Sequence, residues 1–183
     1  MTDALPVLDD PEVLDGFIHE VADFPVPGIA FKDITPLLAD PGAFGRAIDA
    51  LARRVADAGL DIDRVVGTES RGFIFGAPLA LALGCGFVPV RKPGKLPREV
   101  RYEEYSLEYG TDGLEVHVDG IVAGHRVLIV DDVIATGGTA AATGRLVTGL
   151  GGVVAAFAFL MELTGLNGRD HIAEHPILSL ITY

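Results

Sequence analysis

The sequence predicts an α/β protein in which a parallel sheet is flanked by helices. Segments typical of strands alternate with segments typical of helices along the 183 residues. Residues 127–130 form a continuous apolar run, as expected for a strand that is covered on both faces. Several loops after predicted strands carry acidic, basic or glycine residues, and in such sheets ligands bind beyond the carboxyl ends of the strands. We therefore expect these loops to meet in one cleft.

The N-terminal part predicts two helices separated by an irregular segment. A helix is expected to start near Asp10, since Pro11 suits a first helical position. The prolines between residues 23 and 38 favour extended but irregular backbone. Asp40 then caps a second helix, which Gly59 ends. The apolar residues at helical spacing are Phe17, Ile18 and Val21 in the first helix, and Phe44, Ile48, Leu51 and Val55 in the second.

The rest of the chain predicts strands that alternate with helices, interrupted by one β-hairpin. Apolar runs and turn residues place these elements. In order, we expect a strand at residues 64–67, a helix at 73–83, a strand at 87–90, the hairpin strands at 102–109 and 114–118, a strand at 126–130, a helix at 138–150, and strands at 153–160 and 177–182.

An acidic chain with one basic segment indicates a small polyanionic ligand. The net charge of −12 and the pI near 4.6 disfavour general nucleic-acid binding. Five of the 14 basic residues nevertheless lie between Arg91 and Arg101. No apolar stretch reaches the length of about 18 residues typical of a membrane span, residues 1–23 hold seven acidic and no basic residues, and Cys85 is the single cysteine. We expect a cytoplasmic protein that binds neither nucleic acid nor membranes.

Residues 127–139, which read VLIVDDVIATGGT, predict a loop that holds a phosphate group. Small residues and glycines let backbone N–H groups approach an anion closely. The helix expected directly afterwards would point its positive N-terminal end into the loop. The Walker triplet and the dinucleotide fingerprint G-x-G-x-x-G are both missing from the sequence. The expected phosphate-binding residues are Ala135, Thr136, Gly137, Gly138 and Thr139.

Two adjacent carboxylates, Asp131 and Asp132, precede this loop and require a reason, because like charges repel. A ribose supplies one, since its 2′ and 3′ hydroxyls can each donate to a carboxylate. The alternative is an ordinary strand–turn–helix junction with capping Asp and Thr residues. The order of apolar strand, paired acids, two glycines and flanking threonines favours a ribose phosphate.

This loop is similar to the signature of the type I phosphoribosyltransferases, and the resemblance extends over residues 23–183. It implies a Rossmann-like parallel sheet flanked by helices, a small N-terminal hood and a β-hairpin flap. It further implies that residues 1–183 form a single domain in which residues 1–38 contribute the base-binding hood. Asp131 and Asp132 become catalytic residues in this interpretation.

The resemblance also assigns two segments to the pyrophosphate. Residues 67–76 resemble the family's pyrophosphate loop, with a cis peptide expected between Glu69 and Ser70. Residues 91–97 resemble a second pyrophosphate-side loop. For residues 67–76 the alternative is an ordinary βα turn with a surface arginine. For residues 91–97 the alternative is a solvated basic loop, and we expect Lys92 and Arg98 to be solvated. The residues expected to face pyrophosphate are Glu69, Ser70, Arg71, Gly72, Arg91 and Lys95.

Base binding is assigned to residues 23–38 by the same resemblance. Ala30 matches a position that reads the base through its backbone, Phe31 could stack on the ring, and Lys32 stands where some relatives carry arginine. The alternative is a proline-stiffened surface loop with its phenylalanines in the core. Glu108 matches a catalytic glutamate and would handle the proton that the base loses. A lone glutamate on a strand is otherwise most often solvated.

The implied activity is purine salvage by pentosyl transfer. Adenine and phosphoribosyl pyrophosphate would give AMP and pyrophosphate, with Mg²⁺ carried by the substrate instead of a dedicated all-protein metal site. The resemblance also implies a homodimer. Two alternatives stay open: a phosphoribosyltransferase for another base, and a regulator that senses phosphoribosyl pyrophosphate with the same fold.

Overall fold

The computed structural model describes residues 11–106 and 111–183. By its internal contacts the chain forms two compact units, Met1–Ala50 and Leu51–Tyr183. The single domain with a hood at residues 1–38 stays a prediction.

The first unit contains a short helix and a hairpin where the sequence predicted one longer helix. Helix α1 covers only Pro11–Asp15, and strand β1 (His19–Ala22) pairs antiparallel with β2 (Ala30–Asp33). The predicted apolar stripe is therefore wrong, because its three residues all follow Asp15 and Val21 lies in a strand opposite Phe31. A helical pattern carried by three residues is too short to outweigh the strand preference of a β-branched side chain.

The segment predicted to be irregular also holds regular structure. Besides β2, it contains most of helix α2 (Thr35–Ala39). Asp33 starts this helix, since its carboxylate accepts the backbone N–H of Thr35 at 2.9 Å and the Thr35 hydroxyl at 2.8 Å. Helix α3 (Pro41–Asp57) begins as predicted, with the N–H of Ala43 donating to Oδ1 of Asp40 at 2.7 Å.

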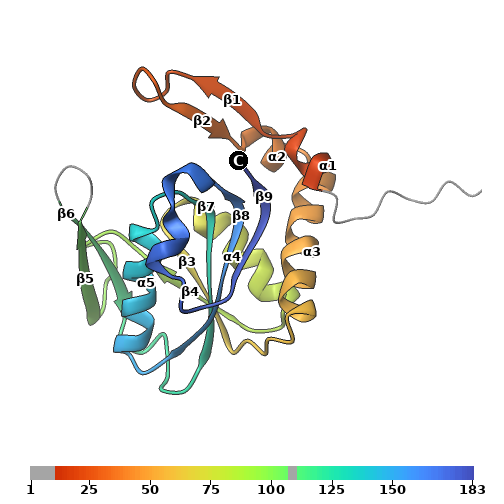
Figure 1. The fold of residues 1–183 in the computed structure, drawn as a ribbon. Helices are drawn as coiled ribbons and strands as arrows, with labels where there is room; N and C mark the ends of the chain where they lie inside the picture. The colour runs from red at the N-terminus through yellow and green to blue at the C-terminus, as the bar shows by residue number, and fades with distance from the viewer. Residues whose placement is uncertain (1–10, 107–110) are drawn as a thin grey trace, which may run out of the picture. The chain divides into compact units, whose positions relative to one another are not determined.

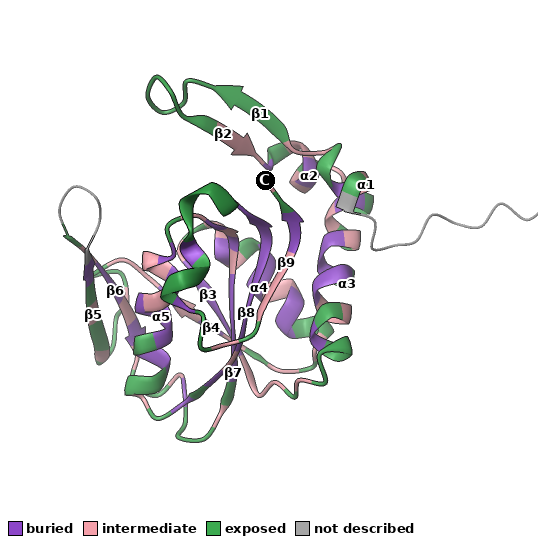
Figure 2. Cartoon of the chain, viewed as in Figure 1, coloured by how far each residue is buried: buried purple, intermediate pink, exposed green. Residues whose placement is uncertain are grey.

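The second unit is built on a parallel sheet, as predicted. Among its described residues the strand order is β4-β3-β7-β8-β9, and each adjacent pair is parallel (Figure 1). The five strands are β3 (Arg64–Thr68), β4 (Gly86–Val90), β7 (Arg126–Ile134), β8 (Val153–Glu162) and β9 (Ile177–Thr182). The three central strands are largely buried (Figure 2).

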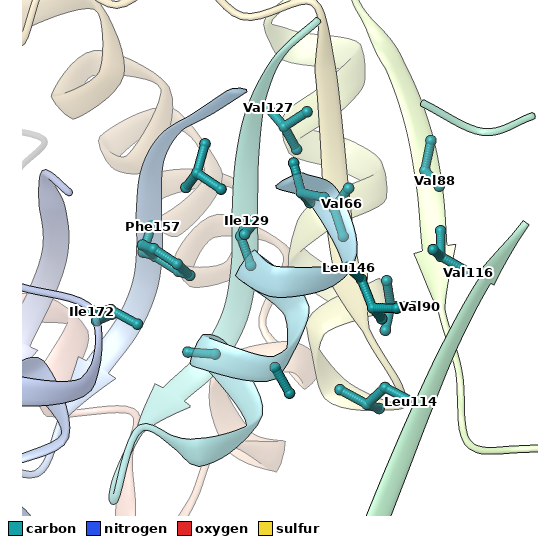
Figure 3. Packing of buried hydrophobic residues seen from close by; sticks show 14 of the residues in the cluster. Val66, Val88, Val90, Leu114, Val116, Val127, Ile129, Leu146, Phe157 and Ile172 are labelled. Carbon is teal, nitrogen blue, oxygen red and sulfur yellow. The ribbon is translucent and has the colours of Figure 1, made fainter. Parts of the chain in front are cut away.

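Helices α4 (Arg71–Ala82) and α5 (Gly138–Gly149) cover opposite faces of this sheet. Val66 belongs to the buried cluster that contains Leu146 of α5 (Figure 3). The next residue, Gly67, faces α4, because a Cβ atom added there would lie 2.9 Å from the carbonyl oxygen of Gly72. Successive strand residues point to opposite faces, so the predicted helices on both faces are confirmed.

The predicted hairpin is present as β5 (Val100–Ser106) and β6 (Thr111–His117), and β5 contacts α5. Two 3₁₀ turns, η1 (Thr164–Leu166) and η2 (Gly168–His171), lie between β8 and β9. Among the described helices, none has the length and apolar character needed to span a membrane.

Candidate active site

A cavity of about 230 Å³ lies at the carboxyl ends of β3 and β7. It gathers predicted residues that are far apart in the sequence, as expected for loops that follow neighbouring parallel strands. The predicted site residues that line it are Glu69, Ser70, Arg71, Asp131, Asp132, Ala135, Thr136, Gly137, Gly138 and Thr139. Thr68, Lys92 and Tyr105 line it as well.

The paired carboxylates sit inside β7 and not in a loop after it. The predicted strand ended at Val130, but β7 continues to Ile134 because it pairs with β8 over its whole length. Oδ1 of Asp131 accepts the N–H of Asp132 at 2.9 Å. Burial and the charge of Asp132 raise the pKa of Asp131 well above its ordinary value. The two carboxylates therefore share a site in which full ionisation of both is unfavourable.

Asp132 forms an ion pair with Arg71, whose Nε lies 2.9 Å from Oδ2. The side chain of Asp132 is 3% exposed, and burial raises its pKa although the Arg71 charge lowers it. Apart from this ion pair, the buried Oδ2 has no hydrogen-bond partner within residues 11–106 and 111–183. A buried acceptor without a donor is suited to a hydroxyl or a hydrated cation from a ligand.

The predicted phosphate loop leads into the N-terminus of α5. Gly137 has φ +80°, a left-handed conformation that favours glycine, and it precedes the first turn of α5. The N-cap residue Gly137 has no side chain that could cap this turn, and Gly137, Gly138 and Thr139 line the cavity, so the N-terminal end of α5 lies at the cavity. Thr139 is held in place, since its hydroxyl donates to the Tyr105 hydroxyl at 3.4 Å.

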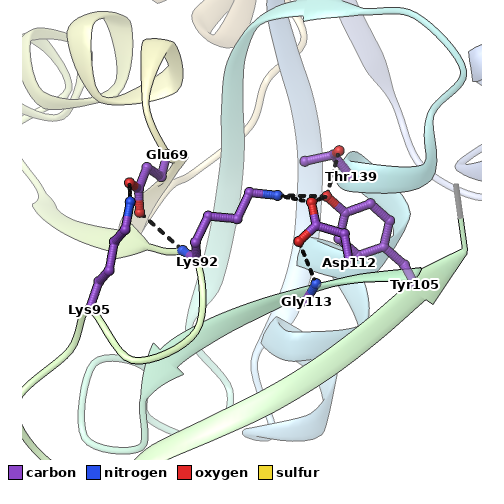
Figure 4. A network of polar contacts seen from close by, with 7 residues as sticks. All are labelled: Glu69, Lys92, Lys95, Tyr105, Asp112, Gly113 and Thr139. Atoms are coloured by element: carbon purple, nitrogen blue, oxygen red, sulfur yellow. Dashed lines mark hydrogen bonds and ion pairs between the residues drawn. The ribbon is translucent and has the colours of Figure 1, made fainter. Parts of the chain in front are cut away.

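Glu69 organises the basic loop. It accepts a hydrogen bond from Nε of Arg91 at 3.2 Å. It also accepts from the backbone N–H of Lys92 at 3.0 Å and from Nζ of Lys95 (Figure 4). Burial alone would raise the pKa of Glu69, but these donors hold it below its ordinary value. The predicted cis peptide between Glu69 and Ser70 is confirmed. Arg91 and Lys95 thus contact the rim of the cavity through Glu69.

Lys92 joins a network that the sequence did not indicate. Its Nζ lies 3.1 Å from the Tyr105 hydroxyl and forms an ion pair with Asp112, which accepts from Tyr105 at 3.2 Å (Figure 4). The expectation of a solvated Lys92 is therefore wrong. Asp112 lies 20 residues away on β6, so only the tertiary structure reveals this contact. Arg98 is exposed, as expected, and pairs with Asp119.

The structure gives no contact with this cavity for the remaining predicted residues. Gly72 is in the first turn of α4 beside β7, where an added Cβ atom would lie 2.7 Å from the carbonyl oxygen of Val130. Its lack of a side chain serves helix–strand packing. Glu108 lies outside the described residues. The predicted base-binding residues belong to the first unit.

Within that unit, Lys32 and Phe31 have partners on the hairpin. Nζ of Lys32 donates to Glu20, its cross-strand neighbour, at 2.8 Å. The Phe31 ring meets Phe24 edge-to-face at 5.1 Å, while Phe24 is 51% exposed. The alternative that placed the phenylalanines of residues 23–38 in the core is therefore wrong for Phe24. Ala30 starts β2 opposite Ala22 and is exposed.

Comparison with known proteins identifies the class of this fold and site. Residues 35–177 match the model of the phosphoribosyl transferase domain. An adenine phosphoribosyltransferase of Myxococcus xanthus is 53% identical over 183 residues, which are all of this chain and 96% of that protein. The chain therefore belongs to the phosphoribosyl transferase family, and its relatives place it among the adenine phosphoribosyltransferases of that family.

Solved structures agree with this assignment. The crystal structure of adenine phosphoribosyltransferase from Thermoanaerobacter pseudethanolicus is 53% identical, with a TM-score of 0.91 over 94% of this chain and 99% of that one. The enzyme from Saccharomyces cerevisiae is 46% identical, with a TM-score of 0.90 over 93% of this chain and 97% of that one. That structure is a complex with an imino-altritol bisphosphate and adenine.

Proposed function

We propose that the chain transfers the phosphoribosyl group of phosphoribosyl pyrophosphate to adenine. The C1′–O bond to pyrophosphate breaks, the C1′–N9 bond to adenine forms, and the N9 proton leaves, so the products are AMP and pyrophosphate. The observation that carries the proposal is the single cavity that joins paired carboxylates to a helix N-terminus and the Thr-Gly-Gly-Thr loop. Relatives at 53% and 46% identity are named for the same reaction.

The phosphate loop would bind the 5′-phosphate of the ribose. The N–H groups at the start of α5 and the hydroxyls of Thr136 and Thr139 are donors for its oxygens. This contact is remote from the reacting carbon and supplies binding energy that orients the ribose. Asp131 and Asp132 would accept the ribose hydroxyls and stabilise the positive charge that develops on the ring.

The pyrophosphate would meet the cations on the β3 side of the cavity. Arg71 already lines the cavity, and its planar guanidinium can bind two phosphate oxygens. Arg91 and Lys95 contact Glu69, and we propose that they turn to the pyrophosphate when it binds. Ser70 would add a contact to the pyrophosphate, whereas Gly72 would support the loop after β3 by its close packing against β7.

Magnesium fits this site. Mg²⁺ prefers oxygen ligands, and the carboxylates of Asp131 and Asp132, which line the cavity, would hold a hydrated ion through water or ribose hydroxyls. We propose that it arrives with the substrate, and when bound it would neutralise charge on the leaving pyrophosphate.

Base recognition is assigned to the first unit and the flap. Ala30 would read the adenine edge through its backbone, Phe31 would contact the ring, and Lys32 would remain with Glu20. Glu108 would accept or stabilise the proton that adenine loses. We further propose a homodimer in the cytoplasm, and size-exclusion chromatography with light scattering checks the dimer.

Turnover with different bases tests the proposed function. Purified protein is given Mg²⁺, phosphoribosyl pyrophosphate and one base, and nucleotide formation is followed by chromatography. We expect AMP from adenine and little product from hypoxanthine, guanine or xanthine. Turnover of one of these bases without turnover of adenine would contradict the choice of base. Tight binding of phosphoribosyl pyrophosphate without any turnover would instead support the regulator.

A further inference from the structure

Behind the cavity, the backbone of the phosphate loop packs directly on the segment that joins β8 to β9. A Cβ atom added to Gly137 would lie 2.2 Å from the carbonyl oxygen of Gly168, and one added to Gly168 would lie 2.2 Å from the carbonyl oxygen of Ala135. Both glycines are buried. The two backbones are thus in contact with no side chain between them, and a displacement of one must displace the other.

The residue that follows Gly168 forms an ion pair at the end of β8. This residue, Arg169, donates from Nη2 to Oε2 of Glu162 at 2.6 Å and from Nε to Oε1. Oε2 also accepts from the Ser179 hydroxyl at 3.0 Å. Glu162 is 6% exposed at the end of β8, where it is the register partner of Ile134 in β7. A guanidinium that binds both oxygens of a buried carboxylate holds one geometry.

The contacts therefore run from the sheet to the phosphate loop. Glu162, Arg169 and Gly168 lie outside the lining of the cavity, so they act on a ligand only through the loop. We propose that the Glu162–Arg169 ion pair is a positioning device that fixes Gly168 and thereby sets the affinity of residues 135–139 for the 5′-phosphate. The inference rests on the proposed function in that it takes these residues to bind a phosphate.

The first test replaces Arg169 by lysine, which keeps the charge and loses the planar fork. Arg126 gives a matched control. It also binds both oxygens of one carboxylate, that of Asp63 at 2.9 Å each, and is 46% exposed where Arg169 is 47%. It lies at the opposite end of β7 from the phosphate loop.

Two measurements on the full chain separate positioning from a general loss of structure. Calorimetry gives the Kd for ribose 5-phosphate, and steady-state turnover gives the KM for adenine. We expect R169K to raise the Kd about tenfold, since a small displacement of binding groups has effects of this size or larger. The KM for adenine should be unchanged, and R126K should alter neither constant.

A second pair of variants tests the backbone contact itself. Gly168→Ala places a Cβ atom against the loop, whereas Gly165→Ala, in the preceding 3₁₀ turn, has no atom within 4 Å of the added Cβ. We expect weaker ribose 5-phosphate binding for G168A only, and this pair decides the question if R169K does not fold. Wild-type Kd values in G168A and R169K would overturn the inference, as would equal losses in R169K and R126K. Failure of the wild-type protein to bind ribose 5-phosphate would overturn the proposed function itself.

Discussion

Replacement of Asp131 by asparagine should make the protein more stable and the enzyme slower. Burial and the neighbouring charge of Asp132 raise the pKa of the Asp131 carboxyl, so its ionised form is unfavourable in the folded protein. Asparagine keeps the size of the side chain. Its carbonyl oxygen can still accept the N–H of Asp132, which Oδ1 accepts at 2.9 Å in the structure. The substitution therefore removes a desolvated charge and retains the local hydrogen bond.

The magnitude follows from the cost of that charge. A buried polar group without full compensation costs on the order of 1–3 kcal/mol. A change of 1 kcal/mol shifts the Tm of a domain of this size by about 2–4 °C, so D131N should raise the Tm at neutral pH by roughly 2–12 °C. Removal of one group that stabilises transition-state charge lowers kcat by about 10²–10³. We expect this loss for D131N.

The pH dependence gives a sharper criterion. Because the folded-state pKa of Asp131 is raised, the folded protein binds this proton more tightly than the unfolded chain. The cost to wild-type stability is present above the folded-state pKa and disappears as the pH falls through it toward the ordinary value of about 3.9. Thermal melts of both proteins over this range should show a Tm difference that shrinks with acidity. A lower Tm for D131N at neutral pH, or a difference independent of pH, would refute the reasoning.

Three further substitutions test separate parts of the site. Gly137→Ala should weaken ribose 5-phosphate binding and lower the Tm more than Gly124→Ala does, as calorimetry and thermal melts would show. Both glycines have a positive φ, so alanine costs about 1–2 kcal/mol at either position. Of the two, only Gly137 would also bring its added Cβ within 2.2 Å of backbone. Equal effects of the two would contradict the close contact. Tyr105→Phe removes the hydroxyl that links Lys92 to Thr139 of the phosphate loop. The KM for phosphoribosyl pyrophosphate should rise several-fold in steady-state assays, while the Tm stays unchanged. An unchanged KM would count against a role of this network in binding. Glu108→Ala should lower kcat with little change in the Kd for phosphoribosyl pyrophosphate, and unchanged turnover would remove Glu108 from the mechanism.

Sequence reasoning succeeded where a local pattern determines local structure. The apolar run at residues 127–130 and the Thr-Gly-Gly-Thr loop predicted a strand and a helix start, and both are present. Predictions were wrong where pairing with a distant strand determines where an element ends. The sequence ends its apolar run at Val130, yet β7 continues through Asp131 and Asp132 because β8 runs beside it. The sequence of residues 131–134 alone does not indicate that β8 lies beside them.

Lys92 illustrates a second kind of failure. A lysine in a basic loop with glycine and proline is most often solvated, and its ion pair with Asp112 depends on the hairpin folding back over 20 residues. Gly168 is similar, since a glycine after Asn167 reads as an ordinary turn. Its contact with the phosphate loop is evident only in the structure, where a Cβ atom added to Gly168 would lie 2.2 Å from the carbonyl oxygen of Ala135.

The adjacency of β3 and β7 in the sheet has a consequence for the placement of the two proposed loops. The loop proposed for pyrophosphate follows β3, the residues proposed for the ribose phosphate follow β7, and the two strands are hydrogen-bonded neighbours. Neighbouring strands lie about 4.8 Å apart, a spacing fixed by backbone hydrogen bonds that side-chain changes scarcely alter. The two proposed loops therefore begin at positions that backbone hydrogen bonds hold side by side. Substitutions in residues 1–38 or in the β5–β6 hairpin can change the proposed contacts to the base without altering that spacing.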